Sequence, residues 1–248
     1  VILAGGVGNS AYPLSLTKPK PMFKILGKPL LHHVVDTLKE AKLKDFIIVT
    51  GHLSDQIKSY FGDGSHLGVN IQYTYQDKPL GMAHAIQTTK GLIEDDFLVV
   101  NGDDIFDASL VEKKINAFKD GSADLLLSCK PTKETWKYGV IKMSNGGLVE
   151  RIVEKPPLGQ EPSNLGVIGA YILPPKIFDY YEKVSLSDVQ HELAIQKFID
   201  GGNAVKAVDY DGIFSSFKRP WDLFTITQQL MNKLLTKSVI EDGVDISE

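Results

Sequence analysis

The first hundred residues alternate short apolar runs with stretches whose apolar residues recur at helical spacing. Predicted strands, each an apolar or alternating run, lie at residues 1–4, 46–50, 71–75 and 97–100. Predicted helices, with apolar positions three or four apart, lie at residues 31–41, 54–61 and 81–89. A β-α-β-α-β-α-β order favours an open, mostly parallel α/β sheet with helices on both faces.

The second half of the chain carries strand-like runs separated by turn residues such as Asn145-Gly146-Gly147. Further strands are predicted at residues 125–129, 139–143, 148–153, 167–173 and 204–208. Further helices are predicted at residues 108–118, 188–202 and 220–233. Tight turns between strands favour antiparallel pairing, so we expect one continuous mixed sheet rather than two domains.

We expect a main domain at residues 1–237, followed by a different segment at 238–248. In that segment Val239, Val244 and Ile246 lie among small and acidic residues, like the first rung of a hexapeptide β-helix. A frayed terminus is the alternative. The chain also begins within a predicted strand and without Met, so we expect a few residues to be missing.

Composition narrows the function classes. The chain has 248 residues, 43% hydrophobic and 23% charged, which is typical of a globular protein. Its net charge of -4 argues against a general nucleic-acid binder, which needs a basic surface. Nothing resembles a signal peptide or the ~18 apolar residues of a membrane span. The single cysteine, Cys129, fits a reducing cytoplasm and is interpreted as a buried strand residue.

A glycine-rich segment, Leu3-Ala4-Gly5-Gly6-Val7-Gly8, directly follows the first predicted strand. Glycines allow positive φ and let backbone N–H groups approach anionic oxygens closely. The spacing is neither the dinucleotide fingerprint nor a Walker A loop. A phosphate-binding loop and a tight structural turn therefore both remain open.

Lysines and prolines alternate soon afterwards, in Thr17-Lys18-Pro19-Lys20-Pro21-Met22 and in Gly27-Lys28-Pro29. Prolines stiffen such a segment, and lysine ammonium groups suit a polyphosphate as point charges. A solvated loop is the alternative interpretation.

Together these motifs resemble the opening signature of sugar-phosphate nucleotidyltransferases, such as glucose-1-phosphate thymidylyltransferases and UTP–glucose-1-phosphate uridylyltransferases. The resemblance continues along almost the whole chain, through Gln76, Pro79-Leu80-Gly81, Asn101-Gly102-Asp103, Tyr138-Gly139-Val140, Glu154-Lys155-Pro156, Ser163-Asn164 and Gly169-x-Tyr171. It implies a Rossmann-like, GT-A-like sheet and an enzyme that joins a nucleoside triphosphate to a sugar 1-phosphate and releases pyrophosphate.

The resemblance also implies roles for individual residues. Nucleotide would be held by Leu3, Ala4, Gly5, Gly6, Gly8, Gln76 and Gly81. The sugar phosphate would be held by Gly139, Glu154, Lys155 and Val167. Lys20 would be the catalytic cation, and Asp103 would carry Mg²⁺. The amide of Gln76 suits the edge of a pyrimidine, so UTP or dTTP is the expected donor.

The chain departs from the family pattern in two motifs. Ser10 stands where the family has an arginine, and Ser216 stands where it has a second metal-binding aspartate. Lys218 replaces the glycine of the same family motif. A hydroxyl is a poor substitute for a carboxylate as a Mg²⁺ ligand, so these departures bear directly on turnover.

Three functions therefore compete. The first is a working nucleotidyltransferase in which Lys218 or Arg219 supplies positive charge. The second is a catalytically impaired subunit or paralogue that binds sugar nucleotides and regulates a partner. The third, a glycosyltransferase, is disfavoured because nothing in the sequence resembles an acceptor site. The expected partners are the two substrates, with no nucleic acid or membrane, and both homo- and hetero-oligomers remain open.

Overall fold

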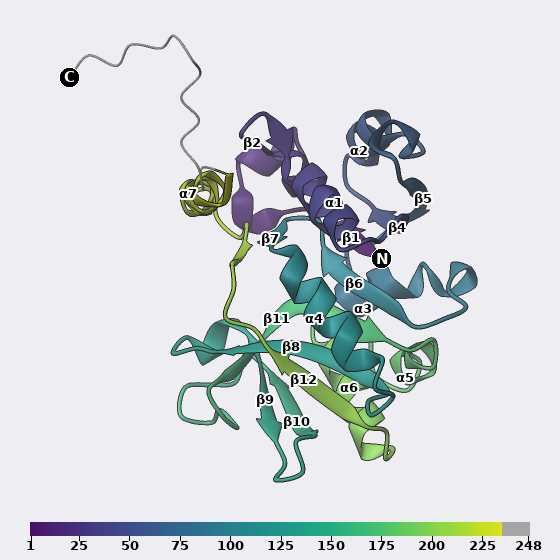
Figure 1. Ribbon diagram of the computed structural model, residues 1–248, viewed down its shortest axis with the longest axis vertical. Coiled ribbons are helices and arrows are strands. Elements are labelled where there is room, and N and C mark those ends of the chain that lie inside the picture. The colour runs from purple at the N-terminus through teal and green to yellow at the C-terminus, as the bar shows by residue number, and fades with distance from the viewer. Residues whose placement is uncertain (235–248) are drawn as a thin grey trace, which may run out of the picture.

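A computed structural model describes residues 1–234, which form a mixed sheet of nine strands with helices on both faces (Figure 1). The strands of this sheet are β1 (Ile2–Ala4), β4 (Asp45–Thr50), β5 (Asn70–Tyr75), β6 (Phe97–Asn101), β8 (Leu125–Pro131), β9 (Gly139–Met143), β10 (Val149–Glu154), β11 (Leu165–Leu173) and β12 (Val205–Asp209). Seven of them follow the order β10-β9-β11-β6-β1-β4-β5, and β8 pairs with β11 and β12.

Parallel pairing unites the four strands from the N-terminal half. In the centre, Ile2 of β1 pairs with Ile48 of β4 on one side and with Val100 of β6 on the other. β5 extends the parallel set beyond β4. The carboxyl ends of these strands therefore meet at one edge of the sheet, which is where ligands bind in open α/β folds.

Antiparallel pairing joins the second half of the chain to the first. β11 runs antiparallel to β6, β8 and β9, and β9 forms an antiparallel hairpin with β10. β12 pairs in parallel with β8. The long strand β11 thus brings loops from the C-terminal half beside the carboxyl end of β6.

Two apolar clusters fill the two faces of the sheet because successive strand residues point to opposite sides. Ile2 and Ala4 belong to the cluster under α1 (Leu30–Glu40), α2 (Ser54–Phe61) and α4 (Ala108–Phe118). Leu3 packs against the opposite cluster, which includes residues of α3 (Met82–Gln87), α5 (Ile177–Tyr181) and α6 (Gln190–Asp200). In Figure 1, α1 and α4 lie in front of the sheet.

Two small sheets lie outside the main one. β2 (Lys24–Ile25) pairs with β3 (Lys28–Pro29), and β7 (Asp104–Phe106) pairs with β13 (Phe214–Ser216). α7 (Asp222–Leu234) follows β13 and packs Ile226 and Leu230 into a third cluster that includes Ile105 and Phe217. This cluster fixes the end of the described chain beside the carboxyl end of β6.

The predicted fold class is confirmed: the chain forms a Rossmann-like, open, mixed α/β sheet flanked by helices. Every strand and helix predicted above is present, with ends within two residues of the expected ones. β2, β3, β7, β13 and α5 were not predicted, because two- to five-residue elements carry little periodicity. The burial expected for Cys129 is confirmed. The segment 238–248 lies outside the described residues, and the domain boundary remains a prediction.

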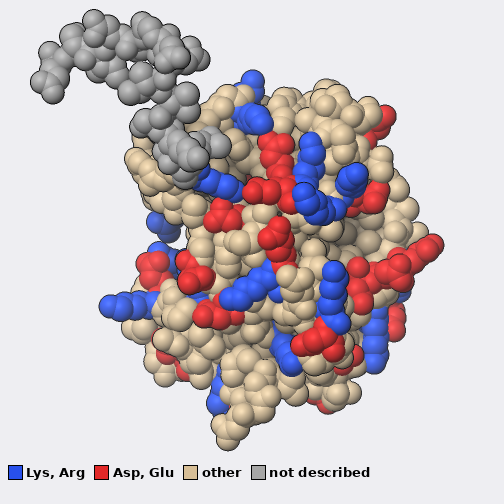
Figure 2. All heavy atoms as spheres, in the orientation of Figure 1, with Lys and Arg blue, Asp and Glu red and all other residues tan. Residues whose placement is uncertain are grey.

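Within residues 1–234, no helix has both the length and the apolar character needed to cross a membrane. Figure 2 shows acidic and basic side chains interspersed over the face that carries α1 and α4.

Candidate functional site

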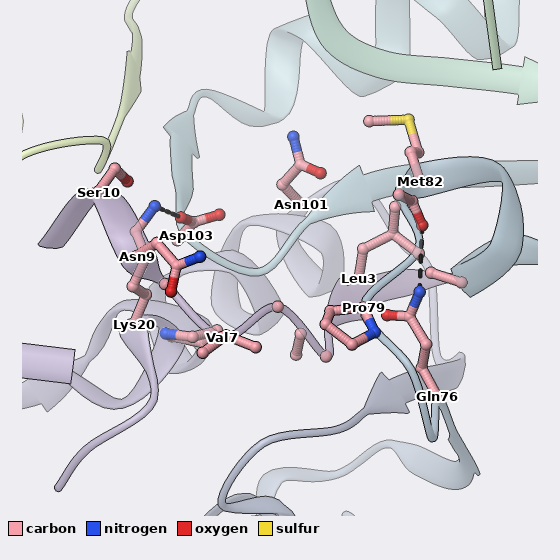
Figure 3. A pocket seen from close by; sticks show the side chains of 17 residues that line it. Leu3, Val7, Asn9, Ser10, Lys20, Gln76, Pro79, Met82, Asn101 and Asp103 are labelled. Carbon is pink, nitrogen blue, oxygen red and sulfur yellow. Dashed lines mark hydrogen bonds and ion pairs between the residues drawn. The ribbon is translucent and has the colours of Figure 1, made fainter. Parts of the chain in front are cut away.

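A cavity of about 540 Å³ opens at the carboxyl ends of β1 and β6. Its lining includes all seven residues predicted to bind nucleotide, together with Lys20 and Asp103. Other lining residues are Val7, Asn9, Ser10, Pro21, Pro79, Met82, Ala85 and Asn101. Figure 3 shows Gln76 and Pro79 at one end of this cavity and Asn9, Ser10, Lys20 and Asp103 at the other.

The glycine-rich loop is shaped by close contacts that side chains would prevent. A Cβ atom at Gly8 would lie 2.8 Å from Cγ of Lys20, and the φ of Gly8 is +76°. A Cβ at Gly51, just after β4, would lie 2.3 Å from the carbonyl oxygen of Gly5. Both positions therefore require glycine, by conformation and contact at Gly8 and by contact alone at Gly51.

Lys20 and Asp103 form an ion pair inside the cavity. The Nζ of Lys20 lies 2.8 Å from Oδ2 of Asp103, and both side chains are largely buried, at 14% and 18% exposure. The same ammonium lies 5.4 Å from the centroid of the buried Phe217 ring. Lys20 enters through a short 3₁₀ turn and Asp103 through the β6–β7 turn, so the pair joins two distant segments.

Gln76 lies buried at the opposite end of the cavity. Its Nε2 donates to the carbonyl oxygen of Gly81 at 3.1 Å and lies 3.1 Å from Nδ1 of His84. With the His84 proton on Nε2, both amide hydrogens have acceptors. The Oε1 of Gln76 is then the atom that can accept a hydrogen bond from a ligand.

A second cavity, of about 160 Å³, lies beside the first. Its lining includes all four residues predicted to bind the sugar phosphate: Gly139, Glu154, Lys155 and Val167. Met82 and Asn101 line both cavities. The structure therefore brings the two predicted groups of residues together as neighbouring cavities with a shared wall.

Lys155 is held in a backbone conformation that is uncommon for a residue with a side chain. Its φ is +43°, and its N–H donates to the carbonyl oxygen of Tyr138 at 2.9 Å. Its Nζ lies 2.9 Å from Oε1 of Glu154. Hydrogen bonding to Glu154 raises the pKa of Lys155, so this side chain is cationic at neutral pH.

Glu192 of α6 also lines the second cavity, and the sequence reasoning missed it. Burial, and then the charge of Glu154, raise the pKa of Glu192 to about 8. A carboxyl group with this pKa is mostly protonated at neutral pH and can donate a hydrogen bond as well as accept one.

Asp104 is a second carboxyl group that the sequence reasoning did not single out. It is 1% exposed, and burial followed by the neighbouring Asp103 charge raises its pKa to about 7. Asn101 Nδ2 donates to its Oδ2 at 2.8 Å, whereas its Oδ1 has no hydrogen-bond partner among the described residues. A Cβ at Gly169 would lie 2.4 Å from Oδ2, so this mid-strand glycine was the available sequence signal.

The two departures from the family pattern lie at the two cavities. Ser10 lines the first cavity with Lys20 and Asp103. Ser216 of β13 pairs with Asp104 of β7 and lines the second cavity. Lys218 also lines the second cavity, with its Nζ 4.9 Å from the centroid of the Tyr138 ring.

Within the described part of the chain, no three or more His, Cys, Asp or Glu side chains are arranged to hold a metal ion. The carboxylate among the residues that line the first cavity is that of Asp103. Mg²⁺ is commonly bound by one or two carboxylates together with substrate phosphates and water. The residues present therefore fit a metal that arrives with a nucleotide better than one held by the protein alone.

Comparisons with known proteins agree with this geometry. The chain is 32% identical over 252 residues to "Bifunctional protein GlmU" of Methanococcus maripaludis, covering 100% of this chain and 58% of that protein. It is 32% identical over 237 residues to "UTP--glucose-1-phosphate uridylyltransferase AglF" of Haloferax volcanii, covering 94% of this chain and 96% of that protein.

Among solved structures, a UDP-glucose pyrophosphorylase complexed with UDP-glucose superposes with a TM-score of 0.83 at 25% identity, covering 94% of this chain and 97% of that one. The "Nucleotidyl transferase" family profile matches residues 1–218. The resemblance read from the motifs is thus confirmed, and the chain belongs to the nucleotidyl transferase family.

Proposed function

We propose that this chain binds a nucleoside triphosphate and a hexose 1-phosphate and transfers the nucleotidyl group between them. The observation that carries the proposal is the pair of neighbouring cavities that share Met82 and Asn101. One holds the glycine loop and Lys20, and the other holds Lys155. Two phosphorylated ligands bound there would meet at the shared wall.

In this reaction a phosphate oxygen of the sugar 1-phosphate attacks the α-phosphorus of the nucleotide. The new P–O bond forms as the bond to the bridging oxygen of the leaving pyrophosphate breaks. The attacking oxygen is already anionic, so no general base is needed. Catalysis then consists of positioning and charge stabilisation, with Lys155 orienting the sugar phosphate and Lys20 neutralising the nucleotide phosphates.

Asp103 is the proposed Mg²⁺ ligand. A Mg²⁺ ion held by Asp103 would supply positive charge that offsets the charge of the nucleotide phosphates. Lys20 Nζ lies 2.8 Å from Asp103 Oδ2, so its ammonium is placed at the same end of the cavity and would contact the nucleotide phosphates. Ser216 lines the neighbouring cavity with only a hydroxyl, so the protein contributes one carboxylate where a pair would hold the metal more firmly.

Uracil or thymine is the proposed base. Oε1 of Gln76 is left as an acceptor, because Nε2 is engaged by Gly81 and His84. The ring N3–H of uracil or thymine can donate to it, as can the N1–H of guanine, whereas N3 of cytosine and N1 of adenine are acceptors; the comparison with GTP below therefore tests the choice of a pyrimidine. Glu154 and Glu192 in the sugar cavity are suited to hydrogen bonding with sugar hydroxyls.

A second candidate is a sugar-nucleotide-binding subunit with impaired catalysis. The supporting observation is that Ser10 and Ser216, both neutral, lie in the lining of the two cavities. An arginine that clamps the transferring phosphoryl group contributes ~10³–10⁵ in rate in other phosphoryl-transfer enzymes. Binding is less affected by such losses, because these interactions act mainly in the transition state.

A binding assay tests the nucleotide assignment independently of catalysis. At equal concentration, UTP or dTTP should raise the thermal unfolding temperature more than ATP or GTP. A ligand at a hundredfold excess over its dissociation constant stabilises the folded state by about 2.7 kcal/mol. Greater stabilisation by GTP would show that Gln76 does not select a pyrimidine.

Pyrophosphate exchange with hexose 1-phosphates then separates the two candidates. Exchange at ~1–10³ s⁻¹ indicates a working enzyme. Binding without exchange indicates the regulatory subunit. For either function, the proposed location of the protein is the cytoplasm.

A further inference from the structure

The second cavity is the proposed sugar-phosphate cavity. Three lysines line it: Lys137, Lys155 and Lys218. Lys155 lies 2.9 Å from a Glu154 oxygen, and Lys137 lies 2.5 Å from a Glu134 oxygen. Among the described residues, Lys218 has no carboxylate within ion-pair distance of its Nζ. It is therefore the lysine of this cavity whose charge is not already offset by a paired carboxylate.

The backbone of Lys218 is fixed although its side chain is exposed. Its N–H lies 2.9 Å from Oδ2 of Asp222, and the next N–H, of Arg219, donates to the same oxygen at 2.6 Å. The preceding residue, Phe217, is fully buried, and its N–H donates to the carbonyl oxygen of Asp103. Lys218 is thus anchored on both sides at the edge of the cavity.

The side chain is also directed. Its Nζ lies 4.9 Å from the centroid of the Tyr138 ring, and Tyr138 itself lines the cavity. A cation–π contact of this kind holds the ammonium near the ring while leaving its hydrogens free to donate. The backbone carbonyl of Tyr138 is the group that accepts from the Lys155 N–H, so Tyr138 links the two lysines.

We propose that Lys218 binds the phosphate of the sugar-phosphate ligand and supplies positive charge there without a metal ion. Its ammonium shares the cavity lining with Ser216, a hydroxyl that holds a divalent cation poorly. Lys155 and Lys218 would then both bind the same phosphate group. The inference rests on the proposed function, because it assumes that a sugar phosphate occupies this cavity.

The test measures binding in EDTA, so that no metal contributes. UDP-glucose and dTDP-glucose serve as probes that carry the sugar phosphate, and UMP serves as a probe without it. Lys218→Met keeps the length of the side chain and removes the charge. We expect it to weaken sugar-nucleotide binding by ~10-fold or more while the UMP affinity stays unchanged. Lys218→Arg should restore most of the loss.

Lys183→Met is the matched control. Lys183 is also exposed and lies over a tyrosine, with Nζ 4.6 Å from the Tyr180 ring centroid, but it does not line the cavity. Lys183→Met should leave both affinities unchanged, and both methionine variants should unfold at the temperature of the unmodified protein.

The outcomes separate the inference from the proposed function. If Lys218→Met binds sugar nucleotides as tightly as the unmodified protein does, the inference is overturned and the proposed function stands. An equal loss of UMP binding would overturn the assignment to the sugar phosphate. If the unmodified protein bound none of the probes, the proposed function would fail as well.

Discussion

Two acidic side chains, Glu154 and Glu192, meet in the sugar-phosphate cavity although nearby carboxyl groups disfavour each other's ionisation. Lys155 offsets the Glu154 charge through its ion pair. Glu192 is instead mostly protonated at neutral pH, because burial and the Glu154 charge raise its pKa to about 8. Tyr171 and Tyr181, both buried and with pKa values raised well above their ordinary value, also face it and remain neutral.

The raised pKa of Glu192 predicts a pH-dependent stability. The unfolded chain releases this proton near the ordinary glutamate pKa of 4.5, whereas the folded protein keeps it until about pH 8. The stabilisation is therefore complete below pH 4.5 and is lost as the pH rises through 8. One pKa unit corresponds to ~1.4 kcal/mol, so we expect Glu192 to lower the unfolding free energy by about 2–4 kcal/mol across this range.

Glu192→Gln, which cannot ionise, should remove this decline and be more stable than the unmodified protein at pH 8.5. Urea unfolding at several pH values measures the difference. Glu112→Gln, an exposed substitution on α4, is the control and should leave the profile unchanged. A profile that Glu192→Gln does not alter would show that this carboxyl group titrates normally.

At the scale of the elements, the shape of the first cavity, which is proposed to bind nucleotide, depends on how closely β1 and β4 approach at their carboxyl ends. Gly5 follows β1, Gly51 follows β4, and the Gly51 Cα lies against the Gly5 carbonyl group. The same loop is lined by the Gln76 amide, whose Oε1 would lie 3.0 Å from a Cβ on Gly5. A small change in strand spacing therefore reaches the proposed base-binding residue directly.

Gly51→Ala tests this dependence. Its Cβ would lie 2.3 Å from the Gly5 carbonyl oxygen, so the backbone must shift. We expect a loss of about 1–3 kcal/mol in stability and a clear loss of nucleotide affinity. Chemical unfolding and nucleotide titration measure the two effects. Gly91→Ala, where a Cβ meets nothing within 4 Å, should change neither. Intact nucleotide affinity in Gly51→Ala would mean that the loop can move without consequence.

The short pair β7–β13 has a similar importance for the phosphate end. It places Ser216 opposite Asp104 and holds Phe217 beneath Lys20. α7 completes this corner by packing Ile226 and Leu230 into the cluster that includes Phe217. Three elements outside the main sheet thus decide which side chains lie beside Lys20 and Asp104.

At the scale of the whole molecule, the site lies where the parallel and antiparallel parts of the sheet join. The glycine loop and Asp103 come from the parallel part, and Lys155 follows β10 of the antiparallel part. Both halves must be correctly placed before two phosphorylated ligands can meet. Ser10 lines the first cavity and Ser216 lines the second, so a charged side chain at either position would change the charge at this junction.

The double variant Ser10→Arg, Ser216→Asp should therefore raise the rate of pyrophosphate exchange. We expect its change in activation free energy to exceed the sum of the changes in the two single variants. In the proposed reaction the two introduced side chains would act on the same transition state, so we expect their effects to be coupled. Removing one preorganised charge typically costs ~10²–10³ in rate, and we expect restored charges to recover a similar factor. Steady-state exchange with Mg²⁺ measures all four proteins.

The Ser216→Asp variant also has a readout independent of turnover. It adds a carboxyl group beside Asp104, so it should be less stable in EDTA and regain stability with Mg²⁺. An unmodified protein that already exchanges pyrophosphate at ~1–10³ s⁻¹ would show that the charges absent at Ser10 and Ser216 are not needed for turnover. The assignment of Ser10 and Ser216 to the family positions would then be the first to revise.

The sequence alone determined the longer regular elements and the predicted binding residues of both cavities. Apolar runs in strands such as Phe97–Asn101 and helical spacing in Leu30–Glu40 are local patterns, so their elements could be predicted. The motifs predicted the residues around Lys20 and Lys155 because each motif is a short run of contiguous sequence. The two groups of predicted residues indeed line two neighbouring cavities.

Only the tertiary structure decided which side chains from other segments lie next to these residues. The Lys20–Asp103 ion pair, the Ser216–Asp104 pairing and the position of Glu192 in the sugar cavity each join segments distant in sequence. No local pattern specifies such contacts, because burial and charge depend on every element packed around a side chain. The lack of a carboxylate partner for Lys218 among the described residues likewise follows from the packing of β13 and α7 beside β7. A side chain's neighbours, and therefore its pKa and its availability to a ligand, are properties of the folded molecule.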